Sequence, residues 1–288
     1  MKSQASLTFL SCGLALSHSL RCCSVMVQSQ GGKLPQTSPQ PAWREQLEGI
    51  KKMRAKKQAQ VDINGAKAIK ERSSGTPQEI RFQVLLSAML SAQTRDEVTA
   101  AALVGLQELT RSYGKLSPVT LLEPSEEEVA TAIKRVSFYN RKAKHMREVC
   151  RILLSTGEED WDIPNTTEGL MSLPGVGPKM TYLVMDLAWG KCEGICVDTH
   201  VHRIAGKLGW VSQQSHNQQE FALFTGPAPT PEHTRKALEA WLPRELWPAI
   251  NPLLVGHGQG ACKAIGPRCG DCTISSICPS SELPLKTS

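Results

Sequence analysis

The segment LPGVGPKM, residues 173 to 180, combines a tight turn with a lysine. Gly175 and Gly177 permit backbone angles that are closed to other residues, and they leave room for turn amides to face an anion. Pro178 suits the first position of a new helix, whose N-terminus also attracts anions. The pattern predicts a helix, a hairpin and a second helix that hold a nucleic-acid backbone without reading its bases. A plain glycine-rich turn between two helices is the alternative.

Lys179 follows that turn directly, and three roles are open to its side chain. The ammonium group can face solvent, contact a phosphate or, after losing its proton, act as a nucleophile. The position alone favours phosphate contact. A nucleophilic amine at neutral pH needs partial removal from water or a neighbouring positive potential, such as a helix N-terminus. The apolar residues Met180, Leu183 and Val184 are compatible with that requirement.

A second candidate is Asp198, in the stretch GICVDTHVHRIAGKLGW (194 to 210). An aspartate between a short apolar run and a helical pattern is usually the N-cap of that helix, which contributes about 1 kcal/mol. A carboxylate fixed near an amine has further uses, because it can take the amine's proton, orient water or stabilise positive charge on a sugar ring. The functional interpretation of Asp198 therefore depends on Lys179 lying nearby.

Four of the ten cysteines lie within the last 27 residues, with the spacing C-x6-C-x2-C-x5-C. This clustering favours a metal site, since disulfide scaffolds belong to short secreted chains. Structural zinc sites usually have two close cysteine pairs, whereas this run has one pair between two longer arms. The layout favours a [4Fe-4S] cluster, with zinc as the alternative. The ligands would be Cys262, Cys269, Cys272 and Cys278, and the first arm carries Lys263 and Arg268 as candidate phosphate contacts.

Helices must position these residues, because the sequence contains no alternating strand pattern. The stretch EIRFQVLLSAMLSAQ, after Pro77, is apolar around nearly its whole circumference and predicts a buried helix that ends near Gln93. The sequence from Thr94 to Glu97 is T-x-x-E and predicts a capping box at the start of the next helix. Further helices are expected over residues 96–112, 125–135, 140–155, 166–172, 178–189, 199–209, 231–240 and 243–256, and a polar surface loop over 212–231.

The composition is that of a globular protein with a mildly basic charge. The sequence has 40% apolar residues, enough to build cores, and no apolar run long enough to span a membrane. The formal charge of +6 permits an anionic partner without requiring one. Residues 1–44 lack Asp and Glu, which is typical of a mitochondrial transit peptide; a secretory signal and plain disorder are the alternatives. The basic run at 50–60 fits a nuclear address, a phosphate-contacting segment or a solvated helix face.

Taken together, the hairpin lysine, an aspartate 19 residues later and the cysteine spacing resemble the endonuclease III family, specifically its eukaryotic DNA glycosylases. The resemblance covers roughly residues 76 to 280. It implies an all-α, bilobed helix-hairpin-helix glycosylase fold with a six-helix domain and an iron-sulfur cluster domain. The N-terminal helix of the cluster domain would lie near residues 41 to 57. The expected divisions are a targeting or disordered segment at 1–40, the N-terminal helix and linker at 41–75, the six-helix domain at 76–191 and the rest of the cluster domain at 192–288.

The same resemblance implies base-excision repair of oxidised pyrimidines by a bifunctional DNA glycosylase and abasic-site lyase. Lys179 would attack C1′ of the damaged nucleotide, expel the base, form a Schiff base and cleave the strand by β-elimination, with Asp198 as the catalytic aspartate. Gln93 matches the residue that fills the gap left in the duplex. His200 and Asp96 also match motif positions of the family.

The sequence departs from the bacterial pattern at the expected wedge. In place of a leucine, VSFYNRKAKH has Phe138 and Tyr139, so an aromatic ring is expected to intercalate. The helix that follows carries a basic run expected to face DNA, made up of Arg141, Lys142, Lys144, His145 and Arg147.

The expected partners are double-stranded DNA with oxidised pyrimidines or abasic sites, and downstream base-excision repair proteins. No membrane partner is expected, and the protein is expected to be a monomer in the nucleus and the mitochondrion. Three competing functions are an adenine-mismatch glycosylase, whose family lacks the hairpin lysine, a non-enzymatic DNA-binding module, and a secreted cysteine protein, which would leave the hairpin motif without a use.

Overall fold

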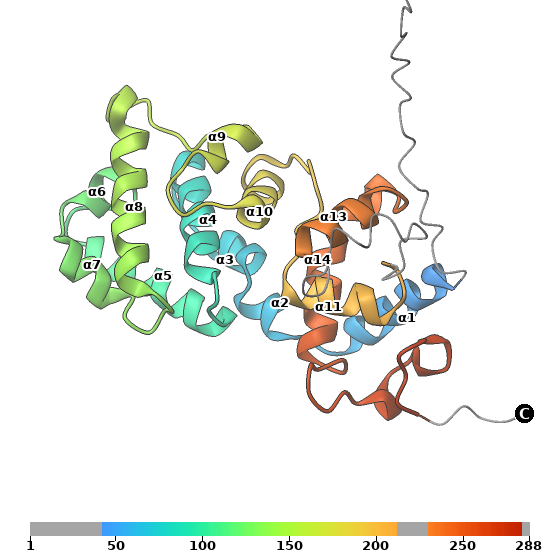
Figure 1. Ribbon diagram of the computed structural model, residues 1–288. Coiled ribbons are helices and arrows are strands. Elements are labelled where there is room, and N and C mark those ends of the chain that lie inside the picture. Colours follow the sequence, from blue (N-terminus) through green and yellow to red (C-terminus); the bar gives the residue numbers. More distant parts are fainter. Residues whose placement is uncertain (1–41, 212–229, 284–288) are drawn as a thin grey trace, which may run out of the picture. The chain divides into compact units, whose positions relative to one another are not determined.

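The computed structural model describes residues 42–211 and 230–283 (Figure 1). All regular structure in these two ranges is helical and none is strand, which confirms the all-α prediction. The predicted targeting segment and nearly all of the predicted surface loop lie outside the described residues. The α-helices are α1 (Trp43–Lys56), α2 (Gln60–Asn64), α3 (Ala66–Arg72), α4 (Pro77–Ser91), α5 (Asp96–Thr110), α6 (Pro118–Leu122), α7 (Glu126–Ala132), α8 (Tyr139–Leu153), α9 (Thr167–Met171), α10 (Pro178–Trp189), α11 (Thr199–Lys207), α13 (Pro231–Glu239) and α14 (Trp247–Gln259).

A first hydrophobic core surrounds α4, which packs against α3, α5, α8 and α10 (Figure 1). The consecutive residues Val84, Leu85 and Leu86 are all fully buried, so several sides of this helix face protein rather than water. A capping box starts the helix, because Glu79 N donates to Thr76 Oγ1 (3.2 Å) and Thr76 N donates to the Glu79 carboxylate (2.7 Å). The buried helix predicted after Pro77 is confirmed.

The capping box predicted at Thr94 is wrong. Helix α5 begins at Asp96 with Arg95 in the N-cap position, and no side chain caps it. Gln93 adopts a left-handed conformation with φ 53° and turns the chain before α5 begins. The Thr94 hydroxyl therefore belongs to this turn, where it donates to Ala92 O (3.2 Å).

A second hydrophobic core joins α1 to α11, α13 and α14. Helix α1 packs against α14, although the two come from opposite ends of the chain (Figure 1). The buried Gln46 of α1 accepts a hydrogen bond from Trp210 Nε1 (2.6 Å) and donates one to Ile277 O (2.9 Å). The helix expected near residues 41 to 57 is confirmed, and its packing ties the N-terminal and C-terminal segments together.

Helices α2 and α3 connect the segments that form the two cores. Helix α2 packs against α5 and α14, while α3 packs against α4. The side chain of Gln259, at the end of α14, donates to Asp96 Oδ2 (2.8 Å) and accepts from Val61 N (2.9 Å). One amide thereby links the first turn of α5 to α2 and α14. None of the described helices has the length and apolar character needed to cross a membrane.

Candidate nucleic-acid interface and active site

The hairpin between α9 and α10 requires glycine at position 175. Gly175 has φ 78°, and a Cβ atom there would lie 2.4 Å from His145 Nδ1 on α8. Both the backbone angle and the contact exclude a side chain. Val176 is buried beneath the turn, and Val176 N donates to Leu173 O (3.1 Å). The hairpin is therefore anchored on the first core and closed by its own backbone.

The outer surface of the hairpin presents backbone N–H groups. Within the described part of the chain, the amides of Gly175, Gly177 and Lys179 have no hydrogen-bond acceptor. A Cβ atom at Gly177 would meet no other atom within 4 Å, so the approach to these amides is open. Free amides at a turn and at a helix N-terminus form a site suited to an anion such as a phosphate.

Lys179 is the second residue of α10, and its side chain is exposed. The protein alone does not remove this amine from water, so the first of the two conditions for a nucleophile is not met without a bound partner. The second condition is met, because the helix N-terminus supplies a positive potential. Val184 is fully buried and Met180 and Leu183 are partly buried against the first core, so these residues anchor the helix rather than enclose the amine.

Asp198 is the N-cap of α11, as the simpler interpretation of its sequence predicts. Its Oδ1 accepts a hydrogen bond from Val201 N (2.8 Å), and the side chain is half-buried. The cap bond involves one carboxylate oxygen and fixes the orientation of the group. A functional role for Asp198 would therefore be performed by a carboxylate that the fold already holds in place.

Cys196 lies between the two candidate catalytic segments. Its buried thiol donates to Lys179 O (3.6 Å), and its carbonyl accepts from Asn251 Nδ2 of α14 (2.9 Å). Burial is the main cause that raises the pKa of this thiol to about 12, while the charge of Lys179 opposes the shift and that of Asp198 adds to it. The hydrogen bond to Lys179 O holds the segment that carries Asp198 against the first turn of α10. The fold thus brings together the two segments that carry Lys179 and Asp198, which lie 19 residues apart in the sequence.

Two residues of this site, Cys196 and Asn251, were not predicted from the sequence. Cys196 stands two residues before Asp198 in an apolar run, and that position was the available signal. Asn251 lies 55 residues further along the chain, and no local pattern connects it to that run.

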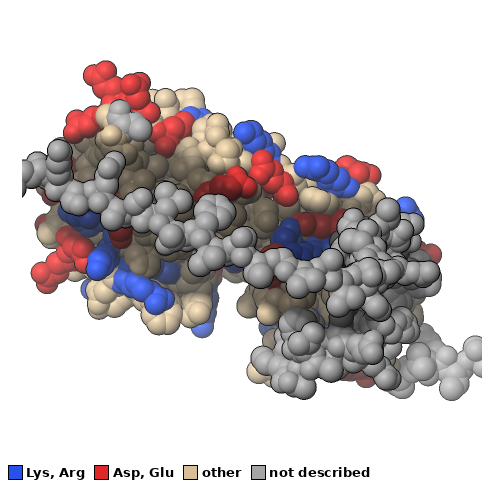
Figure 2. All heavy atoms as spheres, turned by 45° about the horizontal axis from the view of Figure 1, so that its top comes forward, with Lys and Arg blue, Asp and Glu red and all other residues tan. Residues whose placement is uncertain are grey.

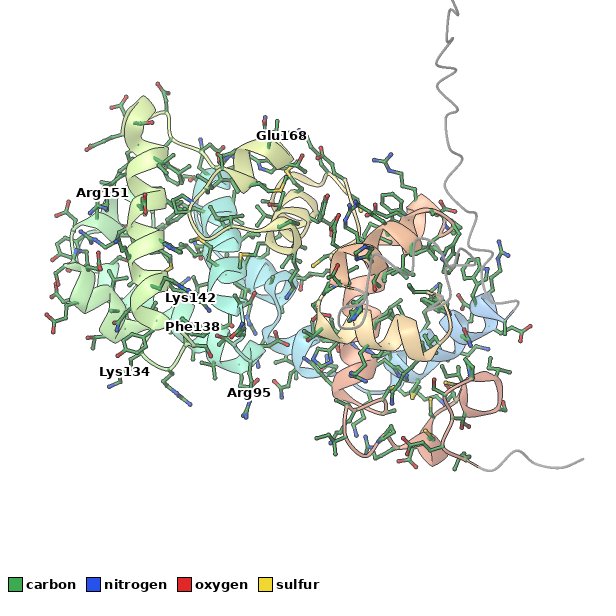
Figure 3. The ribbon with its side chains drawn as sticks, viewed as in Figure 1. Arg95, Lys134, Phe138, Lys142, Arg151 and Glu168 are labelled. Atoms are coloured by element: carbon green, nitrogen blue, oxygen red, sulfur yellow. The ribbon has the colours of Figure 1, made fainter. Side chains whose placement is uncertain are left out.

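The predicted gap-filling and wedge residues lie on two turns that touch each other. Gln93 and Tyr139 are exposed, and Phe138 exposes 55% of its surface. The Ser137 hydroxyl donates to Gln93 O (2.7 Å), which joins the turn after α4 to the turn before α8. Figure 3 labels Phe138 and Arg95 along the same side of the molecule. The Arg141 guanidinium lies 4.9 Å from the centre of the Phe138 ring.

The basic run on α8 does not form one exposed face, contrary to the sequence expectation. Lys142 is buried, Arg147 donates to the carbonyls of Leu121 (3.2 Å) and Pro124, and His145 packs against the hairpin. Only two members of the run are exposed, Arg141 and Lys144. Figure 2 likewise shows basic and acidic residues intermixed on the face that it presents. Helix α8 therefore offers two exposed cations from this run rather than a continuous basic face.

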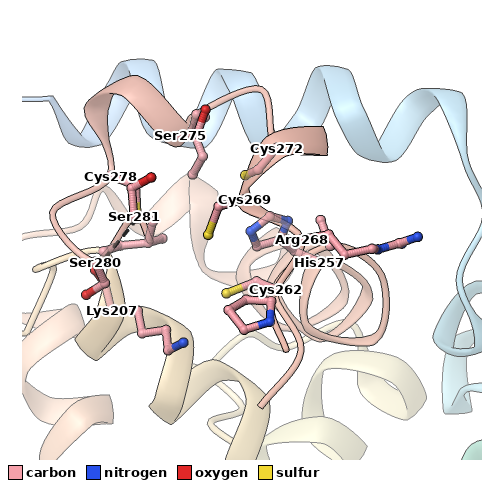
Figure 4. Close-up of a pocket in the computed structure, with 14 residues that line it drawn as sticks. Lys207, His257, Cys262, Arg268, Cys269, Cys272, Ser275, Cys278, Ser280 and Ser281 are labelled. Carbon is pink, nitrogen blue, oxygen red and sulfur yellow. Dashed lines mark hydrogen bonds between the residues drawn. The ribbon is translucent and has the colours of Figure 1, made fainter. Parts of the chain in front are cut away.

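The four clustered cysteines line one pocket (Figure 4). All four are free thiols. Burial raises the pKa of Cys272 and Cys278, and the charges of the neighbouring cysteines raise both further, so the four sulfur atoms lie within electrostatic range of one another. Lys263 and Arg268 of the first arm are exposed, and Arg268 also donates to Gly260 O (3.2 Å). The structure thus brings together the predicted metal ligands and their basic neighbours.

A buried histidine stands beside these thiols. Across residues 42–211 and 230–283, no group of three or more His, Cys, Asp or Glu side chains has the arrangement that holds a metal ion. The buried His257 also lines the pocket, and its Nδ1 has no partner among the described residues. A sulfur-rich group in the pocket would give that nitrogen a partner.

Helix α11 connects the candidate active site to the cysteine pocket. Asp198 caps its N-terminus, and Arg203 in its middle donates to Cys262 O (2.8 Å). Lys207, its last residue, lines the pocket. His200 lies 3.4 Å from the Arg203 guanidinium and packs against Gly258 of α14, so it faces the second core rather than open solvent.

Comparison with known proteins places this geometry in a family. Residues 86–244 match the model of the HhH-GPD superfamily base excision DNA repair proteins. The chain is 46% identical over 241 residues to the chloroplastic endonuclease III homolog 1 of Arabidopsis thaliana, a match that spans 84% of this chain and 59% of that protein. It is 42% identical over 240 residues to endonuclease III-like protein 1 of Gallus gallus, spanning 83% of this chain and 78% of that protein.

A solved structure has the same fold. A trapped endonuclease III-DNA covalent intermediate superposes with a TM-score of 0.64 at 24% identity, covering 83% of this chain and 94% of that one. A thermostable thymine-DNA glycosylase follows with a TM-score of 0.53 at 19% identity, covering 80% and 99%. The chain belongs to the endonuclease III family, within the HhH-GPD superfamily of base excision DNA repair proteins.

Proposed function

We propose that this protein is a bifunctional DNA glycosylase and abasic-site lyase that removes oxidised pyrimidines from double-stranded DNA. The observation that carries the proposal is the hydrogen bond from the Cys196 thiol to Lys179 O, which holds the segment of Asp198 beside that of Lys179. The adjoining hairpin has amides that find no acceptor in the described part of the chain and can hold a phosphate. An adenine-mismatch glycosylase would not use the lysine, and a non-enzymatic binding module would need neither residue.

The chemistry assigned to these two residues has two stages. In the first, Lys179 Nζ forms a bond to C1′ while the bond between C1′ and the base breaks, and the base leaves with the bonding electrons. Asp198 takes a proton from the attacking amine and stabilises the positive charge that develops on the sugar. In the second, the sugar ring opens to a Schiff base, a proton leaves C2′, and β-elimination expels the 3′ phosphate.

DNA binding by the hairpin would complete the site around the amine. The amides of Gly175 and Gly177 would hold backbone phosphates, with Lys263 and Arg268 as further phosphate contacts. Gln93 would fill the gap left by the extruded nucleotide, and Phe138 or Tyr139 would wedge between bases, because a flipped base needs its place in the stack filled. Bound DNA would also remove Lys179 from water, which the free protein does not do.

A [4Fe-4S] cluster is proposed for the cysteine pocket, with Cys262, Cys269, Cys272 and Cys278 as its thiolate ligands. When bound, the cluster would supply structural cross-linking of the C-terminal segment rather than a step of the reaction. The free thiols lining one pocket and the partnerless His257 Nδ1 support this assignment.

The proposed partners follow the family, and the proposed location rests on the sequence. The protein would act as a monomer on damaged DNA, with downstream base-excision repair proteins as further partners. We place it in the nucleus and the mitochondrion on the basic run at 50–60 and the acid-free segment 1–44. A fluorescent reporter fused to residues 1–44 tests the proposed mitochondrial targeting, and secretion of the reporter would contradict that targeting.

Borohydride trapping tests the proposed activity, because only a Schiff base becomes a stable protein-DNA adduct on reduction. With a duplex containing thymine glycol, the reduced adduct should map to the peptide containing Lys179. Lys179→Gln should bind the duplex, since the hairpin amides remain, but form no adduct. Lys191→Gln is the matched control, because Lys191 is exposed just beyond the other end of α10. An adduct that persists in Lys179→Gln assigns the nucleophile elsewhere.

A further inference from the structure

The turns that carry Gln93 and Phe138 share an uncommon backbone conformation. Gln93 has φ 53° and Phe138 has φ 57°, and these are the only residues besides glycine with positive φ in the described ranges. Residues other than glycine rarely adopt this backbone conformation, and residues with bulky side chains adopt it least often. It persists only where surrounding contacts hold it. The contacts around these two turns therefore indicate what fixes the two exposed side chains.

Lys142 contacts both turns. Its backbone N–H donates to Phe138 O (3.0 Å) at the start of α8. Its side chain extends to the other turn, where Nζ donates to Leu90 O and Ala92 O (2.7 Å each) and lies 3.4 Å from Thr94 Oγ1. The backbone N–H of Lys142 thus bonds to the carbonyl of Phe138. Its ammonium group contacts Ala92 and Thr94, the residues on either side of Gln93.

The environment of the Lys142 ammonium excludes a direct role in contacting DNA. The residue is only 8% exposed, whereas Lys144 on the same helix is exposed. Its acceptors are oxygens at the C-terminal end of α4, where the helix dipole favours a cation and where carbonyls lack partners within the helix. Burial, and secondly the nearby charge of Arg141, lowers the pKa of Lys142 to about 8. Figure 3 labels Lys142 close to Phe138.

Ser137 makes the second link between the turns. Its hydroxyl donates to Gln93 O (2.7 Å), and its backbone N–H donates to Thr94 Oγ1 (3.3 Å). Thr94 Oγ1 thereby receives contacts from both Ser137 and Lys142. An ordinary helix cap would satisfy the end of α4 alone, whereas this network ties that end to the start of α8.

We propose that Lys142 is a positioning residue for duplex opening, joining the Gln93 turn to the Phe138 turn so that both side chains enter DNA as one unit. The proposal rests on the proposed function, since it gives the two turns their task. Lys142 does not touch the substrate. It acts by keeping the filler and the wedge at a fixed separation, so that extrusion of one nucleotide and filling of its place occur together.

The test compares two abasic-site substrates, because only in the duplex must the abasic nucleotide leave the stack and its place opposite the partner strand be filled. Single-turnover strand scission is measured at saturating enzyme on an abasic site in a duplex and on the same site in a single strand. Lys142→Met keeps the length of the side chain and removes its donors. We expect about 100-fold slower scission of the duplex, the scale of a 1 Å misplacement, and single-strand scission within about 2-fold of the parent. Lys115→Met, at an exposed lysine outside the basic run of α8, is the control and should cleave both substrates at the parental rate.

Ser137→Ala tests the proposed link between the two turns if Lys142→Met does not fold. Ser137 is exposed, and its hydroxyl makes one bond to the opposite turn. We expect a smaller loss of the same kind, about 5-fold on the duplex alone, equivalent to about one hydrogen bond. Equal losses on both substrates, or parental duplex rates in folded variants, would overturn the role of Lys142. A parent protein that cleaves neither substrate would instead refute the proposed function.

Discussion

Asp198 combines a structural and a proposed chemical role in one side chain. Its Oδ1 caps α11 by accepting from Val201 N, and the same carboxylate acts on the Cys196 thiol together with Lys179. Substitutions at this residue can therefore lose stability, activity or both. The two roles are separable, because an amide can cap a helix as well as a carboxylate but cannot take a proton from an amine.

Asp198→Asn should preserve the free energy of unfolding within about 0.5 kcal/mol, since asparagine and aspartate are comparable N-caps. It should slow base release by about 100-fold, the lower range for a positioned acid-base group. Urea denaturation and single-turnover kinetics on a thymine glycol duplex measure the two effects. Asp198→Ser, which also caps, is the control for helix stability. A variant that is destabilised and slowed in proportion would make the role of Asp198 structural.

At the scale of helices, the sequence predicted the long and strongly patterned elements, together with the short helices α7 and α9, and missed three other short ones. Helices α4 and α10 were predicted because their apolar residues recur over three or more turns. Helices α2, α3 and α6 have 5, 7 and 5 residues, too few for a period to emerge. The false capping box at Thr94 followed from a local pattern whose backbone was decided elsewhere, by the left-handed turn at Gln93.

The candidate site likewise has parts that the sequence predicted and parts that it did not. The hairpin, the aspartate and the cysteines are compact in sequence, so their spacing predicted which segments come together. The basic residues of α8 were wrongly expected to form one exposed face. Lys142 and Arg147 instead donate hydrogen bonds to carbonyls at the end of α4 and at Pro124. Those acceptors lie 52 and 23 residues away in the chain, where helical periodicity carries no information.

The two hairpin glycines should respond differently to substitution, because only one of them is confined. Gly175→Ala should lower the free energy of unfolding by about 1–3 kcal/mol, since φ 78° strains an alanine and its Cβ would meet His145. Gly177→Ala meets open space at φ −114° and should cost about 1 kcal/mol or less, the loss of a glycine N-cap. Urea denaturation of the two variants in parallel measures the difference. Equal destabilisation would mean that His145 does not support the turn.

At the scale of the whole molecule, the C-terminal segment that carries the four cysteines links α1 to α11. Gln46 of α1 donates to Ile277 O, and Thr273 Oγ1 donates to Gly49 O (2.9 Å), so the cysteine segment is bonded to the N-terminal helix. Arg203 connects the same segment to α11. The second core thus depends on a short stretch with little apolar surface of its own, which suits a segment held by a bound group.

Anaerobically purified protein should therefore be brown, absorb broadly near 400 nm and contain about four irons per chain. Cys272→Ser should reduce soluble yield and melting temperature before it affects chemistry, because it removes one ligand of a structural group. Iron analysis, absorption spectra and thermal melts measure these effects. Cys150→Ser is the matched control, since Cys150 is buried in the first core, away from the pocket. Colourless, active protein with stoichiometric zinc would exclude the iron-sulfur assignment.

The span of α11 bears on how inherited variation in such a protein would be interpreted. The helix has nine residues and a length of about 14 Å, with Asp198 at one end and the cysteine pocket at the other. Under the proposed function, a substitution beside Cys262 or Cys278 that tilted α11 would move the Asp198 carboxylate without changing either proposed catalytic residue. Under the same proposal, scores that rank harm by distance from Lys179 would underrate such substitutions.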